Sequence, residues 1–323
     1  MPEYPHSPPV LEALKEFMVE LTANPTPKQA PMRGLVCMVI SCVLFSIMGV
    51  CVYAVQAREP DVSPLVTSFF RILINLFILF GWASTRGNWQ ELFGDKRPSL
   101  WWRGVFGTTA LICSFISIKA IGIGESSFLH ASNGIFVATL APMFLKQKND
   151  KKAWIAIIGA LVGLFFLFEP RLTDAVPYGR ALALAAGFFS ALAYIMIARA
   201  GRSNSPNCVI FYFCVTATVV HSVLFLFIDT SWPTDHFTWF LLFAIGLLGS
   251  LAQVFLTMSY QRSPAALNSA VSYLQPVLNM FAGILFFAVI PDNRAFFGAA
   301  IVFAFGVALP FVRMPHRKSA NHI

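Results

Sequence analysis

Ten long apolar runs, separated by short polar connectors, are the feature of this sequence that most limits its fold. The hydrocarbon core of a bilayer is about 30 Å thick, and about 20 apolar residues in an α-helix cross it. Each run is close to that length. The predicted spans are 34–56, 64–84, 102–121, 125–145, 153–168, 179–198, 207–228, 238–259, 265–289 and 295–312. We therefore predict an all-α integral membrane protein with ten transmembrane helices.

The composition agrees with lipid as the solvent of most side chains. Of the 323 residues, 57% are hydrophobic and 12% are charged, whereas soluble domains contain about 25% charged residues. The net charge of +8 could indicate nucleic-acid binding, but the basic residues lie in short connectors and not along one polar face. We expect the lipid bilayer as a partner and no nucleic acid.

Known catalytic and metal-binding motifs are absent from the sequence. It contains no HExxH, GxSxG or Walker motif, and Asp150, Asp229 and Asp292 lie in connectors. The six cysteines all lie in apolar runs and form no CxxC pair, which argues against a disulfide framework or a zinc site. We therefore expect no enzyme activity, no cofactor, no metal and no ATP-driven pumping.

The distribution of Lys and Arg between alternate connectors predicts the orientation. Seventeen basic residues fall on the side of the amino terminus, and Arg58, Arg171, Arg180 and Arg294 fall on the other side. By the positive-inside rule, the richer side faces the cytoplasm. We expect a multi-pass protein of the cell inner membrane with both termini in the cytoplasm.

The two ends of the chain lie outside the predicted bundle. The arm 1–32 is proline-rich and contains one amphipathic stretch, 10–21, while residues 314–323 form a short tail. Two interpretations of the arm are open, a helix on the membrane surface and a partly disordered tail. Its charged stretch from Glu12 to Glu20 argues against a cleavable signal peptide.

An internal repeat relates the two halves of the chain with an offset of 142 residues. Segment 150–153 falls on 292–295, with an aspartate, a basic residue and an alanine aligned. Other matched positions are Ser126 with Asn268, His130 with Ser272, Asn133 with Gln275, and Val137 with Asn279. Their spacing of i, i+4, i+7 and i+11 puts them on one face of each helix.

The repeat predicts two halves of opposite orientation. Five helices are an odd number, so the second half enters the membrane from the side opposite to the first. Inverted repeats are common in secondary transporters, in which two related halves expose a central site to either side in turn. The sequence therefore predicts alternating access.

Several short motifs form a further pattern. They are Phe70-Arg71, the passage 120–136, Gln275-Pro276, the pair Gly159 and Gly163, and Glu169-Pro170. With the ten-helix layout, they resemble the EamA-type carriers of the drug/metabolite transporter superfamily. The resemblance implies two five-helix repeats, 33–170 and 178–313, and a transport function. The sequence departs from the family pattern at Gly134, where the resemblance implies a proline like Pro276.

Polar side chains inside apolar helices are the candidate site, because they are costly in hydrocarbon unless they face a cavity or a partner. The candidate substrate-binding residues are Arg71, Ser126, His130, Asn133, Tyr194, Gln253, Tyr260, Asn268, Ser272, Gln275 and Asn279. The alternative for these residues is interhelical hydrogen bonding that holds the bundle together. The candidate gating residues are Lys119, Glu125, Gly134 and Pro276.

Two of these residues carry a specific hypothesis. Arg71 lies inside its predicted helix, where its guanidinium needs a carboxylate, backbone carbonyls or an anionic substrate group, or else extends toward the outer surface. His130 titrates near neutral pH when exposed, so it is the candidate for proton coupling, with simple packing as the alternative.

The sequence thus predicts a secondary transporter for a small polar metabolite. Amide, hydroxyl and aromatic side chains with one deep arginine suit an amino acid or a nucleoside-like compound such as S-adenosylmethionine. The alternatives are a channel-like facilitator and a membrane binding protein that does not transport. Both a monomer and a homodimer are compatible with the sequence.

Overall fold

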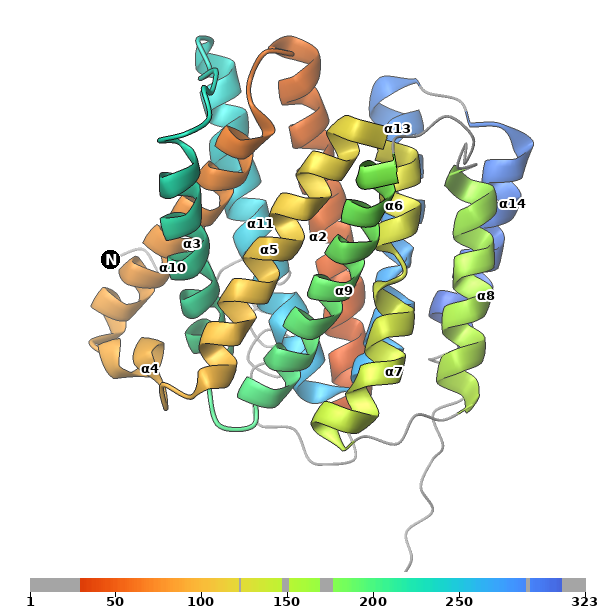
Figure 1. Ribbon diagram of the computed structural model, residues 1–323, viewed down its shortest axis with the longest axis horizontal. Helices are drawn as coiled ribbons and strands as arrows, with labels where there is room; N and C mark the ends of the chain where they lie inside the picture. Colours follow the sequence, from red (N-terminus) through yellow and green to blue (C-terminus); the bar gives the residue numbers. More distant parts are fainter. Residues whose placement is uncertain (1–29, 122, 147–150, 169–176, 289–290, 310–323) are drawn as a thin grey trace, which may run out of the picture.

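The computed structural model describes residues 30–121, 123–146, 151–168, 177–288 and 291–309, and all secondary structure in these residues is helical (Figure 1). The helices are α2 (Ala30–Arg58), α3 (Pro64–Arg86), α4 (Trp89–Phe93), α5 (Pro98–Ile121), α6 (Ile123–His130), α7 (Asn133–Leu145), α8 (Lys151–Phe168), α9 (Pro177–Ala200), α10 (Pro206–Leu224), α11 (His236–Arg262), α12 (Ala265–Ser272), α13 (Leu274–Phe287), α14 (Asn293–Val302) and the π-helix η1 (Phe303–Ala308) that continues α14. The arm 1–29 and the tail 310–323 lie outside the described residues.

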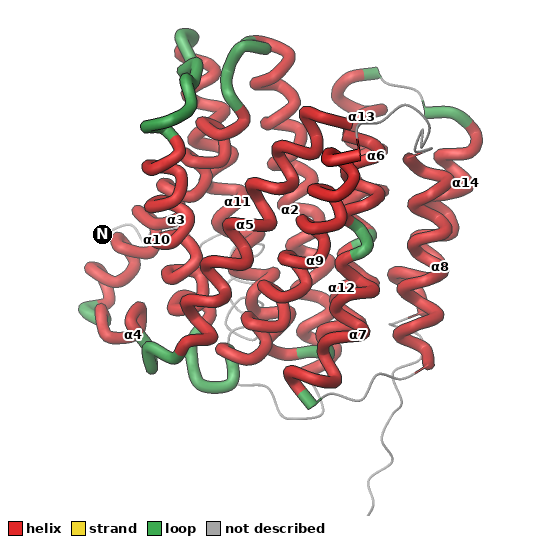
Figure 2. Tube along the Cα trace, viewed as in Figure 1, coloured by secondary structure: helices red, strands yellow, loops and turns green. Residues whose placement is uncertain are grey.

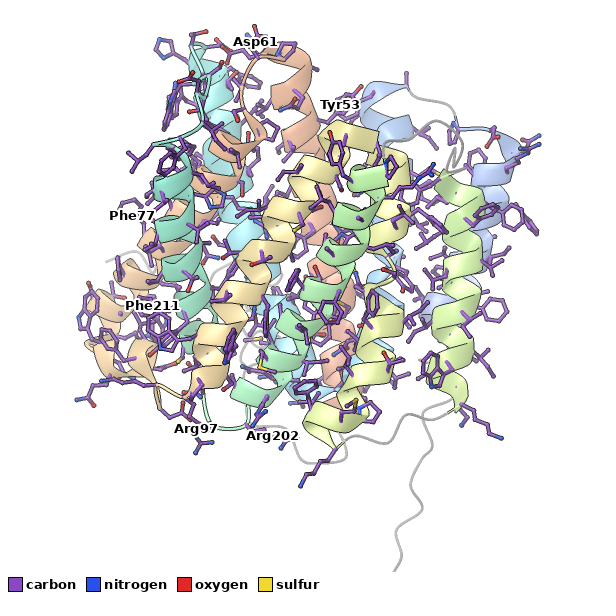
Figure 3. All side chains as sticks on the ribbon, in the orientation of Figure 1. Tyr53, Asp61, Phe77, Arg97, Arg202 and Phe211 are labelled. Atoms are coloured by element: carbon purple, nitrogen blue, oxygen red, sulfur yellow. The ribbon has the colours of Figure 1, made fainter. Side chains whose placement is uncertain are left out.

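The protein is an all-helical membrane protein. Eight helical segments are long and apolar enough to cross a bilayer: α2, α3, α6 with α7, α8, α9, α10, α11, and α12 with α13. The other two predicted spans coincide with α5 and with α14 and η1, so the number of ten stays a prediction. Large apolar side chains cover the outside of the bundle, such as Phe77, which is 63% exposed (Figure 3). In a membrane such side chains face lipid.

The two halves begin equivalent helices at equivalent residues. Pro64 and Pro206 start α3 and α10, and the hydroxyls of Ser63 and Ser205 accept hydrogen bonds from backbone N–H groups of the first turn. Proline fits the first turn because its missing N–H would have no helical partner there. Both pairs are 142 residues apart. The starts of α6 and α12, and of α8 and α14, are separated by the same number, which supports the predicted repeat.

The halves run in opposite directions and interlock. Helix α2 packs along α11, and α9 packs along α5 (Figure 1). We call the end of the bundle that carries the α9–α10 connection the basic end, where Figure 3 shows Arg97 and Arg202, and the other the opposite end, where it shows Asp61. Helix α2 finishes at the opposite end and α9 at the basic end.

Two of the predicted spans are broken helices. Helix α6 ends at His130 and α7 starts at Asn133, and Figure 2 shows a loop between them; α12 ends at Ser272 and α13 starts at Leu274. The prediction of two continuous helices was wrong at these points. In the second half, Pro276 has no N–H for the Ser272 carbonyl, which ends the regular hydrogen bonding. The first half breaks without a proline.

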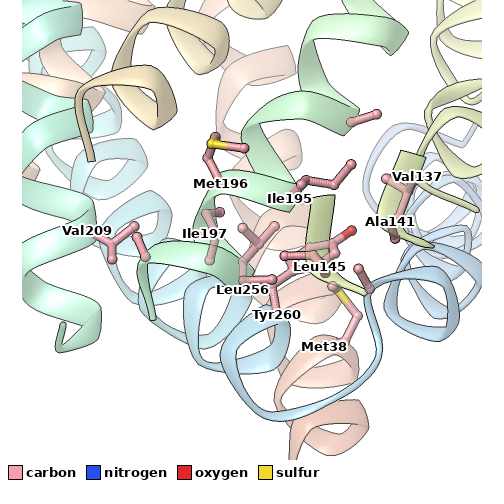
Figure 4. Close-up of a cluster of buried hydrophobic side chains, with 14 of the residues drawn as sticks. Met38, Val137, Ala141, Leu145, Ile195, Met196, Ile197, Val209, Leu256 and Tyr260 are labelled. Carbon is pink, nitrogen blue, oxygen red and sulfur yellow. The ribbon is translucent and has the colours of Figure 1, made fainter. Parts of the chain in front are cut away.

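An apolar core joins the two halves at the basic end. Its buried side chains come mainly from α2, α7, α9, α10 and α11, with single members or pairs from α5, α12 and α13. The labelled members in Figure 4 are Met38, Val137, Ala141, Leu145, Ile195, Met196, Ile197, Val209, Leu256 and Tyr260. Most lie in the last turns of their helices at this end. Apolar side chains therefore close the space between the helices at the basic end.

Helices α8 and α14 approach each other closely at the edge of the bundle. A Cβ atom on Gly163 would lie 2.7 Å from the carbonyl oxygen of Gly298, so only glycine fits. Gly159, one turn before Gly163 in α8, lies against Phe305 of η1. This packing occurs within one chain.

Candidate functional site

Arg71 reaches the middle of the bundle. A Cβ atom on Gly249 would lie 3.0 Å from both Cγ and Nε of Arg71, and Gly249 stands thirteen residues from either end of α11. The Arg71 guanidinium carbon lies 5.1 Å from the ring centroid of Phe45 in α2. The side chain is therefore directed into the bundle and does not extend to the outer surface.

Arg103 is a second interior arginine, which was not among the predicted substrate-binding residues and was counted with the basic residues of the cytoplasmic side. It lies in α5, five residues after Pro98, and is 4% exposed. Its guanidinium carbon lies 4.3 Å from the ring centroid of Phe213, and one terminal nitrogen lies against Gly107, one turn further into the bundle. The sequence contained a signal for this: Trp101 and Trp102 precede Arg103, and tryptophans mark the membrane interface.

The two arginines lie near each other and lack carboxylate partners. Each is close enough to interact electrostatically with the other, and Tyr194 and Cys214 lie near both. Neither takes part in an ion pair in the described part of the chain. The spanning helices contain no aspartate, and their only glutamate is Glu125 in α6, whose side chain lies outside the described residues.

Gln253 and two tyrosines continue this site along α11. Gln253 is 4% exposed, and its Nε2 has no hydrogen-bond partner within the described part of the chain. It lies one turn from Gly249, on the same face of the helix. Seven residues further on, Tyr260 stacks on Tyr194 with ring centroids 4.6 Å apart. The structure thus brings together the predicted residues Arg71, Tyr194, Gln253 and Tyr260.

Polar side chains also gather at the break between α6 and α7. His130 Nε2 lies 2.9 Å from Ser190 Oγ of α9. Asn133 Oδ1 and Ser132 Oγ are buried without hydrogen-bond partners. Gly187 allows this approach, because a Cβ atom there would lie 2.7 Å from Ser132 Oγ. His130 and Asn133 therefore form a second polar cluster between α7 and α9.

Two predicted residues are occupied by hydrogen bonds within the protein. Asn268 donates to the Ser259 carbonyl at 2.8 Å and accepts from Ser263 Oγ at 2.7 Å. Ser126 Oγ bonds to Ser117 Oγ of α5, and both side chains are buried. These contacts match the alternative of interhelical bonding, so we leave Asn268 and Ser126 out of the proposed substrate site.

The remaining predicted residues of the second half lie around the α12–α13 break. Ser272 Oγ donates to the Ser269 carbonyl at 2.8 Å. Gln275 and Asn279 lie on α13, which packs along α2; the side chain of Gln275 is partly exposed and that of Asn279 is exposed. A Cβ atom on Gly49 of α2 would lie 3.6 Å from Asn279 Oδ1.

The predicted gating glycine and proline directly follow the breaks. Gly134 is the second residue of α7 and Pro276 the third of α13. A side chain on Gly134 would collide with the hydroxyl of Tyr273, which explains a glycine at this position. The side chains of Lys119 and Glu125 lie outside the described residues, so their predicted pairing stays a prediction.

Polar contacts link connectors at both ends of the bundle. At the opposite end, Glu59 Oε1 accepts from the backbone N–H of Thr234 at 2.9 Å and from its hydroxyl at 2.6 Å, and Arg58 pairs with Asp235. At the basic end, Asp95 accepts from Asn204 Nδ2 at 2.9 Å. We call these the opposite-end latch and the basic-end latch.

The described residues contain no cluster of three His, Cys, Asp or Glu side chains that could hold a metal ion. A cavity of about 340 Å³ lies between α8 and α14, lined by Phe165, Phe166, Asn293, Arg294 and Phe297. It is mainly aromatic and lies at the edge of the bundle, on helices other than those that carry the two interior arginines. We therefore treat it separately from the central site.

A polytopic helical bundle with polar groups at its centre defines a membrane transport protein. The chain belongs to the EamA-like transporter family, whose model matches residues 32–169 and 177–309. This membership agrees with the predicted resemblance and identifies the protein as a transporter and not an enzyme.

Named relatives cover most of the chain. A pseudopaline exporter, CntI of Pseudomonas aeruginosa, is 25% identical over 276 residues, covering 85% of this chain and 95% of its own. A riboflavin transporter of Vibrio cholerae is 24% identical, covering 85% of this chain and 92% of its own. Solute carrier family 35 member G1 of Mus musculus is 24% identical, with 84% and 76% covered.

A solved crystal structure has the same fold. It superposes with a TM-score of 0.75 at 15% sequence identity, and the match covers 87% of this chain and 97% of the other.

Proposed function

We propose that this protein is a secondary transporter that moves a small polar metabolite by alternating access, with the substrate bound between the halves beside Arg71, Gln253 and Tyr194. The observation that carries the proposal is Arg71 at the midpoint of α11 without an ion-pair partner in the described residues. A guanidinium at this depth is costly, and interior charges of membrane proteins mark substrate or ion paths. Family membership supports transport.

The alternation is carried by the contacts between the halves. The apolar core closes the basic end, and the opposite-end latch joins the α2–α3 and α10–α11 connectors. Opening one end while closing the other requires α2 and α11 to move together relative to α5 and α9. The breaks in α6–α7 and α12–α13 provide hinges, because unpaired backbone groups let each half-helix turn separately.

The substrate class that the site favours is narrower than the range of substrates named for relatives of this protein. Relatives are named for pseudopaline and for riboflavin, so membership alone does not choose a substrate. The predicted candidates were an amino acid and a nucleoside-like compound. Of these, S-adenosylmethionine fits least, because its sulfonium cation would lie beside Arg71 and Arg103. A polar metabolite with at least one anionic group fits the site.

Several finer features belong to the same proposal. The charge bias of the connectors supports an inner-membrane protein with both termini in the cytoplasm. The His130–Ser190 pair supports coupling to protons, because a change in the charge of His130 alters a contact between α6 and α9. Fluorescent-protein fusions to each terminus test the orientation, since these proteins fluoresce only when folded in the cytoplasm.

Counterflow in proteoliposomes tests the proposal. The purified protein is reconstituted, the vesicles are loaded with an unlabelled compound, and uptake of the same radiolabelled compound is followed for carboxylates, neutral amino acids, nucleosides and S-adenosylmethionine. We expect saturable uptake that internal substrate accelerates, loss in Arg71→Gln, and no loss in Arg86→Gln, an exposed arginine of the same helix. Uptake that never saturates and is not accelerated would indicate a channel instead.

A further inference from the structure

The centre of the bundle holds two positive charges and no described negative charge. Arg71 and Arg103 approach from α3 and α5, Arg103 lies within electrostatic range of Arg71, and neither has an ion-pair partner in the described residues. A low-dielectric interior strengthens the repulsion between like charges. Two buried guanidinium groups without carboxylate partners in the described residues therefore favour an anion between them.

The contacts made by the two guanidinium groups do not neutralise them. Each group stacks on a phenylalanine ring, Arg71 on Phe45 and Arg103 on Phe213. A ring attracts a cation but carries no net charge and accepts few of the five N–H donors of a guanidinium. Among the residues that the structure describes, none accepts a hydrogen bond from the buried Nε of Arg103. If Arg103 only anchored the bundle, backbone carbonyls or a carboxylate would accept from this donor.

The positions of the two arginines are related by the repeat. Phe213, beneath Arg103, stands 142 residues after Arg71 and is therefore its equivalent in α10. The two guanidinium groups thus occupy corresponding places on either side of the axis that relates the halves. Gly249 and Gly107 make room for them, one on each side.

We propose that Arg71 and Arg103 form one anion site and that the transported substrate is an organic dianion whose charge lies on carboxylate or phosphate groups. The inference rests on the proposed transport function and names its substrate class. A guanidinium presents parallel N–H donors that match the oxygens of carboxylate and phosphate. The Tyr194 hydroxyl lies near both arginines and adds a neutral donor.

The accessibility of the two arginines suggests an order of contact. Arg71 is partly exposed, whereas Arg103 is 4% exposed. An incoming anion meets Arg71 first and completes its contacts at Arg103. Both arginines are therefore needed for tight binding, and the loss of either removes about half of the compensating charge.

Ligand-induced stabilisation of the full-length protein tests the anion site without requiring transport. The unfolding midpoint in detergent is measured with succinate, citrate and glycerol phosphate as anions, glutamine and inosine as neutral compounds, and lysine and choline as cations. We expect at least one anion to raise the midpoint and no neutral compound or cation to do so. Binding stabilises the folded state in proportion to the logarithm of ligand concentration over Kd.

The variants distinguish the loss of a positive charge at the site from a general loss of folding. Arg71→Gln and Arg103→Gln are each expected to weaken the apparent affinity for the anion at least tenfold, while Arg71→Lys and Arg103→Lys keep part of it and Arg86→Gln keeps all of it. Gly107→Ala keeps the charge but displaces the Arg103 guanidinium, so it should also weaken binding. The inference is contradicted if an anion stabilises Arg103→Gln and the wild type equally, or if only neutral or cationic compounds stabilise the protein. It is also contradicted if no anion raises the midpoint at 10 mM, a concentration about tenfold above the upper end of the usual range of substrate KM values.

Counterflow with the same compounds tests transport separately from anion binding. Anion binding without accelerated exchange of any compound supports the anion site and contradicts transport. Accelerated exchange of a neutral or cationic compound, unchanged in Arg103→Gln, supports transport and contradicts the anion site.

Discussion

The hydroxyl of Tyr273 donates a hydrogen bond of 2.6 Å to the carbonyl oxygen of Ala131, and these two residues are 142 apart in the sequence. They are therefore equivalent positions of the repeat, and they meet where the breaks of α6–α7 and α12–α13 face each other. A contact between equivalent residues lies next to the axis that relates the halves. The helix is interrupted at Ala131, so its carbonyl accepts a turn hydrogen bond from the Gly134 N–H at 3.3 Å and has a second lone pair for Tyr273.

Removing this hydrogen bond should loosen the two broken helices. Tyr273→Phe leaves the ring in place but removes the shorter of two hydrogen bonds to the Ala131 carbonyl, which also accepts from the Gly134 N–H at 3.3 Å. The expected cost in the free energy of unfolding is about 0.5–1.5 kcal/mol. Denaturant unfolding in detergent measures the loss. Tyr178→Phe, at an exposed tyrosine, is the matched control and should change nothing. An unchanged stability of Tyr273→Phe would show that the contact does not hold the halves.

Gly134 and Tyr273 should behave as one unit. An alanine side chain at Gly134 collides with the Tyr273 hydroxyl, so Gly134→Ala should destabilise the wild type. In the Tyr273→Phe background the hydroxyl is gone, and the same change should cost less. A double-mutant cycle measures the difference, for which contacting residues typically give about 0.5–3 kcal/mol. Additive effects would mean that the two residues do not interact.

Arg103 should reduce the stability of the unliganded protein. Its guanidinium is buried without an ion pair in the described residues, and even buried ion pairs are often replaced by apolar side chains of similar volume with a gain of about 1–4 kcal/mol. Arg103→Met should therefore raise the unfolding midpoint in the absence of ligand while abolishing transport. Arg86→Met, at an exposed position, serves as control. A lower midpoint for Arg103→Met would argue for a structural role of the arginine.

The opposite-end latch should weaken in acid. Hydrogen bonds from Thr234 lower the pKa of Glu59 below its ordinary value of 4.5, and a hydrogen bond from Arg58 lowers the pKa of Asp235 below 3.8. A carboxylate with a lowered pKa stabilises the folded state above its ordinary pKa, and this contribution is lost as the pH falls through the lowered value. The latch is therefore intact at neutral pH and is lost below about pH 4.

Two aspartates of the opposite end provide the comparison for this prediction. Asp235→Asn should lower the unfolding midpoint at pH 7, and the difference from wild type should shrink toward zero as the pH falls below 4. Asp229→Asn, in the same connector, should have little effect at any pH. A difference for Asp235→Asn that stayed constant with pH would contradict the electrostatic origin of the latch.

The close packing of α8 on α14 should tolerate no side chain at Gly163. Gly163→Ala places a methyl group against the Gly298 carbonyl, and overpacking of this kind costs about 1–3 kcal/mol. Gly283→Ala is the control, because nothing lies within 4 Å of a Cβ atom there. Comparison of the two unfolding midpoints checks the prediction. Equal midpoints would show that the two helices can separate slightly at no cost.

Much of the architecture could be predicted from apolar length and repeat offset alone. Each predicted span coincides with a helix or a broken helix, and the offset of 142 relates Pro64 to Pro206. The breaks could not be predicted in the same way. The break in the first half is followed by Gly134, where a side chain is excluded by Tyr273 of the other half. This break therefore depends on tertiary packing and not on the local sequence alone.

The site could be predicted only in part, because sequence shows polarity but not partners. Asn268 and Gln253 are both amide side chains in apolar helices. In the structure, Asn268 accepts one hydrogen bond and donates another, whereas Gln253 Nε2 has no hydrogen-bond partner among the described residues. Arg103 is the second residue of the predicted span 102–121 and was counted with the cytoplasmic basic residues, whereas α5 starts at Pro98 and so places Arg103 more than one turn inside the helix. A basic residue near a helix end is ordinarily interfacial, and its direction into the bundle depends on the glycine at 107.

Transport of an organic anion past Arg71 and Arg103 can be tested in proteoliposomes loaded with a defined mixture of anionic, neutral and cationic metabolites, with mass spectrometry of what leaves the vesicles. We expect the compounds lost through the wild-type protein to be anions, and we expect vesicles with Arg71→Gln or Arg103→Gln to retain them and vesicles with Arg86→Gln to lose them. Selective loss of neutral or cationic compounds, or loss of anions that persists in both interior variants, would contradict it.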